Sequence, residues 1–218
     1  MRCLMCGEPI GTETFADLFR GEDVLCSVCR GQWKRISHRF RFCGKNAFGL
    51  YEYNDAFSSC LIQFKELGDE ALKDVFLYPD RARLKRMYHG RTLLLLPSVA
   101  GKLEARGFSH LWEMFESIGL PMLEPFVKRD TGDQKARTRR ERKTMESGIT
   151  LKAGVHLPKR VVLADDVITS GSTMKGALAV LPKDLDVQVF ACAITPKLRP
   201  QSEGKRFLNA IINKDIII

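Results

Sequence analysis

The sequence lacks any long apolar run, which argues against a membrane-spanning helix. No stretch approaches the roughly 18 apolar residues needed to cross a bilayer. The N-terminal segment MRCLMCGEPI lacks the apolar core of a secretory signal peptide. A Walker A loop is excluded as well, because the dipeptide Gly-Lys is never followed by Ser or Thr. We therefore expect a cytoplasmic protein without membrane insertion, in a compartment where thiols stay reduced.

Acidic residues are missing from two of the most basic segments of the chain. Residues 30–45 carry six Lys or Arg residues and residues 81–91 carry five, and neither segment contains an acid. Residues 128–143 carry eight against three acids, and the 218-residue chain has a net charge of +9. With 44% hydrophobic and 28% charged residues, the composition is typical of a globular protein with one ordinary domain and a small appendage.

Aromatic rings are interleaved with the charges of the first basic segment, at Trp33, Phe40 and Phe42. Basic groups that follow a phosphate backbone, together with rings that stack on bases, are the parts of a groove for single-stranded nucleic acid. The alternative is a solvated basic surface whose rings pack inward, and the sequence does not decide between the two. The candidate residues for single-stranded DNA are Trp33, Lys34, Arg35, Arg39 and Arg41.

Four cysteines form two Cys-x-x-Cys pairs with 19 residues between them, which is zinc-ribbon spacing. Four thiolates close a tetrahedral structural zinc site, and the metal would supply folding energy that a short segment with few large apolar residues lacks. Disulfides are the main alternative and need an oxidising compartment. A redox Cys-x-x-Cys usually lies beside a βαβ unit, and neither pair does. The predicted ligands of structural Zn²⁺ are Cys3, Cys6, Cys26 and Cys29.

Three further cysteines are left over. Cys60 and Cys192 lie in apolar surroundings, so we predict that they are small core residues. Cys43 is open to two interpretations, because it could be the remnant of a further metal pair whose partner is missing.

Residues 160–174, RVVLADDVITSGSTM, form the most informative segment. An apolar run leads to two adjacent acids, Asp165 and Asp166, and then through a loop rich in hydroxyl groups and glycine into a helix-like stretch. Backbone N–H groups at such a helix N-terminus point at an anion, and carboxylates accept hydrogen bonds from sugar hydroxyls. The alternative is a purely structural role, as a buried strand followed by a capped helix. The candidate phosphate ligands are Thr169, Ser170, Gly171, Ser172 and Thr173.

Strands alternate with helices along the rest of the chain, which predicts a parallel sheet with helices on both faces. The expected strands are at about 48–53, 92–96, 121–127, 160–165 and 187–194. The expected helices are at about 55–65, 70–87, 100–118 and 174–182. The last 20 or so residues could add an edge strand.

The order of these motifs resembles the ComF family, which comprises competence-associated proteins with a domain like the type I phosphoribosyltransferases. The loop after Asp165 is similar to the family's phosphoribosyl diphosphate (PRPP) loop, D-D-x-x-x-T-G-x-T. In chain order, the earlier motifs are the cysteine pairs, a K-x-x-G-D turn at Lys65–Asp69, a strand ending at Pro97, R-G-F at 106–108, Gln134 and Glu141-Arg142.

The chain departs from the family pattern in several places. The usual R-G-F-N-Q is R-G-F-S-H here, with Ser109 and His110 in place of the amides. A Pro-x-Pro motif has become Pro97-Ser98, and an asparagine usual after the Glu-Arg pair is absent. These changes concern the acceptor side of any reaction more than PRPP binding.

The resemblance implies a type I phosphoribosyltransferase-like α/β domain over residues 46–218, preceded by a zinc-ribbon module over residues 1–45. It implies PRPP bound with Mg²⁺, the 5′-phosphate on Thr169–Thr173 and the ribose hydroxyls on the two acids. The diphosphate would meet the turn residues Lys65, Gly68 and Asp69. In any transfer reaction, the catalytic residues would be Asp165, Asp166 and Lys65.

Two functions are compatible with this pattern. One is a DNA-uptake protein of natural transformation, in which the PRPP-binding domain and the zinc module handle single-stranded DNA beside other competence or DNA-translocation proteins. The other is a metabolic phosphoribosyltransferase that acts on a small base or amine. In either case, the Arg-rich segment 129–147 is expected to close over the site and exclude water.

Overall fold

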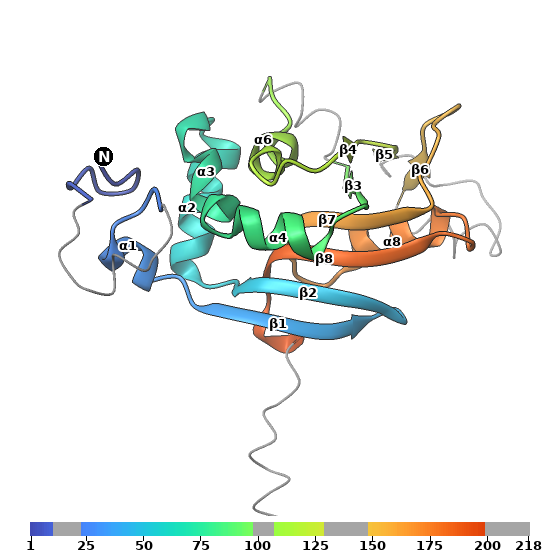
Figure 1. Ribbon diagram of the computed structural model, residues 1–218, viewed down its shortest axis with the longest axis horizontal. Coiled ribbons are helices and arrows are strands. Elements are labelled where there is room, and N and C mark those ends of the chain that lie inside the picture. Colours follow the sequence, from blue (N-terminus) through green and yellow to red (C-terminus); the bar gives the residue numbers. More distant parts are fainter. Residues whose placement is uncertain (11–22, 98–106, 129–147, 199–218) are drawn as a thin grey trace, which may run out of the picture.

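The chain folds as an α/β protein around one mostly parallel sheet (Figure 1). The computed structural model describes residues 1–10, 23–97, 107–128 and 148–198. Its six-stranded sheet has the order β1-β2-β8-β7-β3-β4, and only β1 runs antiparallel to its neighbour. The predicted α/β architecture with a mostly parallel sheet is therefore confirmed.

The strands of the main sheet are β1 (Arg35–Phe42), β2 (Lys45–Glu52), β3 (Thr92–Leu95), β4 (Met122–Leu123), β7 (Arg160–Ile168) and β8 (Asp186–Ile194). A separate ribbon consists of β5 (Phe126–Lys128) and β6 (Ile149–Leu151). The single strand expected over 121–127 is therefore wrong, because Pro125 separates β4 from β5 and proline cannot donate to a ladder. Strand β3 is buried throughout, as its continuous apolar run predicts.

The helices are α1 (Ser27–Gly31), α2 (Asp55–Glu66), α3 (Asp74–Leu77), α4 (Arg81–Met87), α6 (His110–Glu116) and α8 (Ser172–Val180). Short 3₁₀ turns cover Glu70–Lys73, Tyr78–Asp80 and Pro196–Leu198. The single helix predicted over 70–87 is therefore wrong. The 3₁₀ turn at Tyr78–Asp80 separates α3 from α4 and contains Pro79. Proline in a helix interior removes a hydrogen bond and clashes with the preceding turn.

Helices cover both faces of the sheet. Phe190 of β8 contacts Tyr88, which follows α4, with ring centroids 5.8 Å apart. On the opposite face, Phe42 of β1 packs against Gly171, the N-cap of α8, where an added Cβ would come within 2.5 Å of the ring. Phe42 pairs with Lys45 of β2, and Phe190 pairs with Phe48 of the same strand. Lys45 and Phe48 are three residues apart, an odd number, so Phe42 and Phe190 lie on opposite faces of the sheet. Figure 1 shows α4 and α8 on the two sides accordingly.

The basic segment around residue 40 belongs to the sheet rather than to the cysteine module. Strand β1 pairs with β2 along its length, and β2 pairs in parallel with β8. The domain boundary expected at residue 45 therefore falls inside the β1–β2 hairpin. Composition had suggested the opposite, because the basic residues of β1 make it look like a solvated surface segment.

Several predicted features lie outside the described residues. They are the Arg-rich segment 129–147 with Gln134, Glu141 and Arg142, the start of the helix expected at 100, and the C-terminal segment 199–218. Among the described residues, no helix is long and apolar enough to cross a membrane.

Candidate functional site

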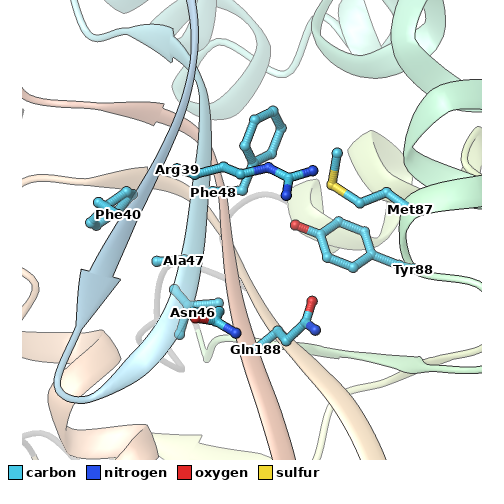
Figure 2. Close-up of a pocket in the computed structure, with 9 residues that line it drawn as sticks. Arg39, Phe40, Asn46, Ala47, Phe48, Met87, Tyr88 and Gln188 are labelled. Atoms are coloured by element: carbon cyan, nitrogen blue, oxygen red, sulfur yellow. The ribbon is translucent and has the colours of Figure 1, made fainter.

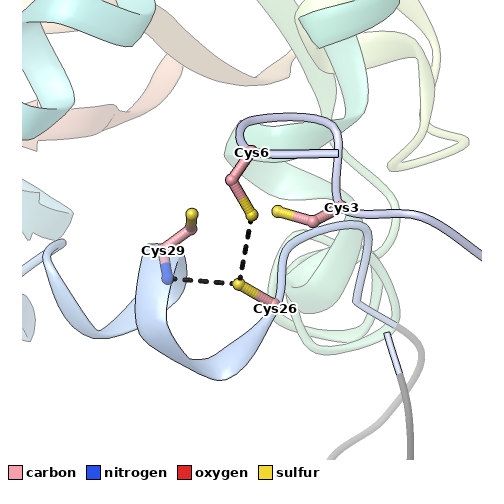
Figure 3. A group of neighbouring side chains, drawn as sticks. All are labelled: Cys3, Cys6, Cys26 and Cys29. Atoms are coloured by element: carbon pink, nitrogen blue, oxygen red, sulfur yellow. Dashed lines mark hydrogen bonds between the residues drawn. The ribbon is translucent and has the colours of Figure 1, made fainter. Parts of the chain in front are cut away.

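The four N-terminal cysteines come together at one point (Figure 3). Their sulfur atoms all lie within 4.8 Å of one another. Cys6 Sγ and Cys26 Sγ are 3.7 Å apart. This separation matches the edge of ~3.8 Å expected for a tetrahedron with zinc–sulfur bonds of ~2.3 Å. The donor set and its geometry therefore fit a structural metal such as zinc, as the spacing of the cysteines predicts.

Short local elements place these cysteines. Cys26 is the N-cap of α1, and its sulfur accepts a hydrogen bond from the backbone N–H of Cys29 at 3.5 Å. Gly7, with φ of +75°, closes the turn that carries the first pair. The two turns are joined by a backbone hydrogen bond of 3.0 Å from Leu4 N–H to the carbonyl of Val24. Each half of the site thus comes from local sequence.

The thiols influence one another's ionisation. Burial opposes ionisation of Cys3, but hydrogen bonds from neighbouring backbone N–H groups outweigh it and lower the pKa of Cys3 to about 6. The pKa of Cys29 is raised, first by burial and then by the other three thiols. Four thiols this close cannot all ionise without a counter-charge, which a divalent cation supplies.

The other cysteines do not join this group. All seven cysteines lie in the described residues, and none forms a disulfide. Cys60 and Cys192 are buried, which confirms the prediction that they belong to the core. Cys43 is exposed in the turn between β1 and β2 and is not among the four clustered cysteines.

The second group of predicted residues lies where β7 ends and α8 begins. The strand continues through Asp165 and Asp166 to Ile168, so it is longer than expected. Gly171 has φ of +71°, a conformation that glycine adopts without strain. Its lack of a side chain also lets the turn lie directly on Phe42. A substitution at Gly171 would therefore disturb both the turn and the packing below it.

Hydroxyl groups surround the N-terminus of α8. Thr169, Ser170 and Ser172 are exposed, and Thr173 is half-buried. The Ser170 hydroxyl donates to Ser172 Oγ at 3.2 Å and lies 3.4 Å from the backbone N–H of Ser172. The first turn of a helix carries backbone N–H groups without intrahelical partners and a positive dipole end. The loop therefore has the chemistry of an anion site.

Two side chains from distant parts of the chain converge on Asp166. Lys65 Nζ, at the end of α2, lies 2.9 Å from Asp166 Oδ2. His110 Nε2, at the start of α6, lies 3.1 Å from the same oxygen. Only 5% of the surface of Asp166 and 3% of that of His110 is exposed, so this contact lies inside the protein. The fold thus brings the K-x-x-G-D turn beside the paired acids.

This environment shifts the pKa values of the two carboxyl groups in opposite directions. Burial alone would raise the pKa of Asp166, but the contacts with His110 and Lys65 outweigh it and hold that pKa well below its ordinary value. Burial and the neighbouring Asp166 carboxylate raise the pKa of Asp165 well above its ordinary value. Adjacent acids with divergent pKa values are typical of functional sites, because one is kept ionised while the other binds a proton readily.

Not every residue predicted for PRPP reaches this point. Gly68, with φ of +73°, lies in the turn after α2. The Asp69 carboxylate accepts a hydrogen bond of 3.0 Å from the Gln63 amide. Among the described residues, no hydrogen bond joins Asp69 to Asp165 or Asp166, so Lys65 is the member of the turn that the fold places on the acids.

His110 was not among the predicted site residues. The sequence did carry a signal, because Ser109 and His110 are where the family's R-G-F-N-Q pattern changes. Ser109 is the N-cap of α6, so it fixes the start of the helix that presents His110. A role for His110 could not be assigned from sequence alone, since its partner Asp166 lies 56 residues further along the chain.

The residues predicted for single-stranded DNA divide into two groups. Trp33 is 4% exposed, and its ring contacts Tyr51, Phe57 and Phe76 at centroid distances of 5.3, 4.8 and 5.5 Å. Its prediction as a base-stacking residue is therefore corrected, because an enclosed ring offers no free face. The alternative, that the rings of this segment pack inward, holds for Trp33 and for the buried ring of Phe42.

The cations of the same segment also differ. Lys34 pairs with Glu52 at 2.9 Å, and Arg35 pairs with the buried Asp80. Arg39 and Arg41 are exposed on β1 and form no ion pair with any described residue. Of the cations predicted to bind single-stranded DNA, Arg39 and Arg41 are therefore the two that remain without an ion pair to a described residue.

Comparisons with known proteins find two similar competence proteins. No family model matches the chain. The chain is 28% identical to competence protein ComFC of Streptococcus pneumoniae, over 88% of this chain and 99% of that protein. It is 23% identical to competence protein ComFC of Bacillus subtilis, over 82% of this chain and 88% of that protein. These two relatives, similar over most of their length, support the resemblance of the chain to the ComF family.

Proposed function

We propose that this chain is a competence protein that acts in DNA uptake during natural transformation and binds PRPP through a phosphoribosyltransferase-like domain. The names of the two relatives support the role in competence. The observation that carries the PRPP part is the convergence of Lys65 and Asp166 beside an exposed loop at a helix N-terminus. Ligands of open α/β sheets bind at this edge, beyond the carboxyl ends of the strands.

Each part of the site has a role in this proposal. The hydroxyl and backbone N–H groups of Thr169–Thr173 bind the 5′-phosphate. Asp165 and Asp166 accept hydrogen bonds from the ribose hydroxyls, and Lys65 reaches the diphosphate as a point charge. Mg²⁺ prefers one or two carboxylates plus phosphate oxygens, so the acids suit it, and when bound it would neutralise charge on the diphosphate. His110 holds Asp166 in place.

The cysteine module has a structural role in this proposal. The four thiolates would hold zinc and fold a segment that has little apolar core of its own. We place the end of the module near Gln32 rather than at residue 45, because β1 belongs to the sheet. In this proposal, the rest of the chain forms the phosphoribosyltransferase-like domain. The protein as a whole handles single-stranded DNA.

Calorimetry with PRPP and Mg²⁺ tests the central part. Wild-type protein should bind PRPP, and Asp165→Ala should weaken binding by roughly tenfold to a hundredfold, because removing one partner of a buried hydrogen bond costs roughly 1–3 kcal/mol. Asp184→Ala is the matched control, since Asp184 is a surface acid that pairs with Lys159. It should leave the affinity unchanged.

Two outcomes would change the proposal. If wild-type protein binds no PRPP at millimolar concentration with Mg²⁺ present, the PRPP part is wrong. If PRPP binds and a free base or amine stimulates release of diphosphate, the metabolic phosphoribosyltransferase is the better assignment. Adding a single-stranded oligonucleotide to the same titration tests whether DNA is handled by the same protein.

A further inference from the structure

A pocket opens on one face of the sheet, between the β1–β2 hairpin and the end of α4 (Figure 2). Its volume is about 320 Å³. This is near the lower limit of pockets that hold small organic ligands. The side chains that matter for its chemistry are Arg39, Asn46, Phe48, Met87, Tyr88 and Gln188.

This pocket is separate from the paired acids. Gln188 is in register with Val162 of β7, whereas Asp165 is in register with Ala191, further along β8. Asn46 lies at the start of β2. The pocket therefore lies toward the amino ends of the parallel strands, and the acids lie toward their carboxyl ends. A ligand here would not compete with PRPP for the same groups.

The two acid-free basic segments of the sequence meet at this pocket. Arg39 and Arg41 come from the first segment. They lie on the same face of β1 and pair with Phe48 and Asn46 of β2. Arg83 comes from the second, and its guanidinium lies 5.3 Å from the centre of the Phe48 ring. Arg39 lines the pocket itself, whereas Arg41 and Arg83 lie next to it, against the lining residues Asn46 and Phe48.

The three arginines differ in how many contacts they already make within the protein. Arg83 lies 3.6 Å from Asp80. Arg41 Nη1 donates to Asn46 Oδ1 at 2.5 Å, and Arg41 also donates to the backbone carbonyl of Gly44. Arg39 forms no ion pair with any residue in the described ranges. In Figure 2 its guanidinium points into the same space as the Tyr88 hydroxyl and the Gln188 amide.

This combination suits one type of ligand. Arginine supplies charge for a phosphate and a planar group on which a base can stack. The amides of Asn46 and Gln188 and the Tyr88 hydroxyl both donate and accept hydrogen bonds, as the edge of a base requires. A purely anionic ligand would not need these neutral groups, and an apolar ligand would not need the arginines.

We propose that this pocket holds one nucleotide of a single-stranded DNA chain, with the base on the exposed guanidinium of Arg39 and the adjacent phosphates on Arg39 and Arg41. The Tyr88 ring is buried, with 2% of the residue exposed, so Tyr88 would contact the base edge only through its hydroxyl. The proposal rests on the DNA-handling part of the proposed function and names where the strand is held. A duplex is excluded from this mode of binding, because its paired bases cannot enter a pocket without leaving the stack.

Fluorescence anisotropy with a labelled oligothymidylate tests the proposal on the full-length chain. Arg39→Ala should weaken binding by roughly tenfold or more and reduce the slope of log affinity against log salt by roughly 0.7. Lys152→Ala is the matched control, since Lys152 is an exposed cation that directly follows β6. It should change the affinity by much less than Arg39→Ala.

A second comparison separates the base from the phosphate. An oligonucleotide of the same length with abasic sites should bind wild-type protein less tightly than oligothymidylate. In Tyr88→Phe, which removes only a hydroxyl, this difference should shrink severalfold. A circular dichroism spectrum like that of wild type would show that both variants are folded.

Three outcomes would overturn the proposal. If wild-type protein binds the oligonucleotide but Arg39→Ala and Lys152→Ala behave alike, the strand binds elsewhere and only the pocket assignment fails. If wild-type protein binds PRPP but no single strand at low salt, the DNA-handling part of the proposed function fails with it. If free thymidine monophosphate binds as tightly as the strand, the pocket serves a free nucleotide instead.

Discussion

The cysteine group and the paired acids are both clusters of ionisable side chains, but they are assembled differently. The cysteines come from two short turns that lie within the first 29 residues of the chain. Asp166 instead meets Lys65 across 101 residues and His110 across 56. The first site is therefore assembled from local turns, whereas the second depends on the whole sheet and its helices.

This difference has consequences for stability. Loss of the metal should affect the cysteine module and spare the sheet, because the sheet has its own buried core. Loss of a partner around Asp166 should affect the acids without unfolding the domain. Trp33, which follows the cysteine module, packs against rings of the larger domain, and the Arg30 guanidinium lies 4.9 Å from the centre of its ring. Four predictions address this comparison, and the largest effect comes first.

Cys26→Ser should remove zinc and unfold the cysteine module. The apparent free energy of zinc binding in zinc-finger peptides is roughly 10–16 kcal/mol, so losing the metal removes most of the module's stability. Elemental analysis measures the metal, and hydrogen exchange should show β7 and β8 still protected. Cys43→Ser is the control and should retain its zinc, because Cys43 is not part of the cluster. Equal loss from both variants would contradict the assignment.

Trp33→Ala should destabilise the whole protein by roughly 3–5 kcal/mol, the usual cost of truncating a large buried aromatic side chain. Denaturant unfolding gives the free energy. Trp112→Ala is the matched control, because Trp112 is 38% exposed, and it should cost much less. A small effect at Trp33 together with weakened single-strand binding would instead restore the base-stacking interpretation.

Asp166→Asn should lower stability at neutral pH by roughly 1.5–3 kcal/mol, because the contacts of a charged carboxylate are lost. The pKa of Asp166 is lowered on folding, so its contribution is present above the ordinary value of 3.8 and disappears as the pH falls through the folded value. Asp165 has a raised pKa, so its charge opposes folding above 3.8 and Asp165→Asn should stabilise the protein near neutral pH.

Thermal unfolding of both variants between acidic and neutral pH measures this contrast. The difference between the two should narrow as the pH falls toward the range in which both carboxyl groups are protonated. If the two substitutions change stability in the same direction at neutral pH, the contact of Lys65 and His110 with Asp166 does not separate the acids.

Lys34→Ala should cost only roughly 0.2–1 kcal/mol, the usual contribution of an exposed ion pair. Lys34 pairs with Glu52 at the end of β2, and the Lys34 side chain is 57% exposed. High salt should remove most of this difference, because exposed charges are screened. Chemical denaturation in urea at two salt concentrations tests it. A cost as large as that of Trp33→Ala would mean that the ion pair, rather than the ring, joins the two regions.

Much of the fold could be predicted because its signals are local. The apolar run before Asp165 and the helix from Asp55 are read directly from spacing. α2, for example, buries Phe57, Cys60, Leu61 and Phe64 at helical intervals. Strand β1 was missed for the opposite reason. Its inward rings alternate with arginines on a partly open face, so composition alone resembles a solvated or DNA-binding segment.

The sequence by itself determined the sites that depend on near neighbours. The cysteine spacing indicates a metal site, and the order of acids, hydroxyl groups and glycine indicates a loop at a helix N-terminus. Only the tertiary structure decided which distant groups meet. It placed Lys65 and His110 on Asp166, buried Trp33, and brought Arg39 and Tyr88 to one pocket. These contacts depend on strand order and helix packing, which bring together residues whose separation along the chain carries no local signal.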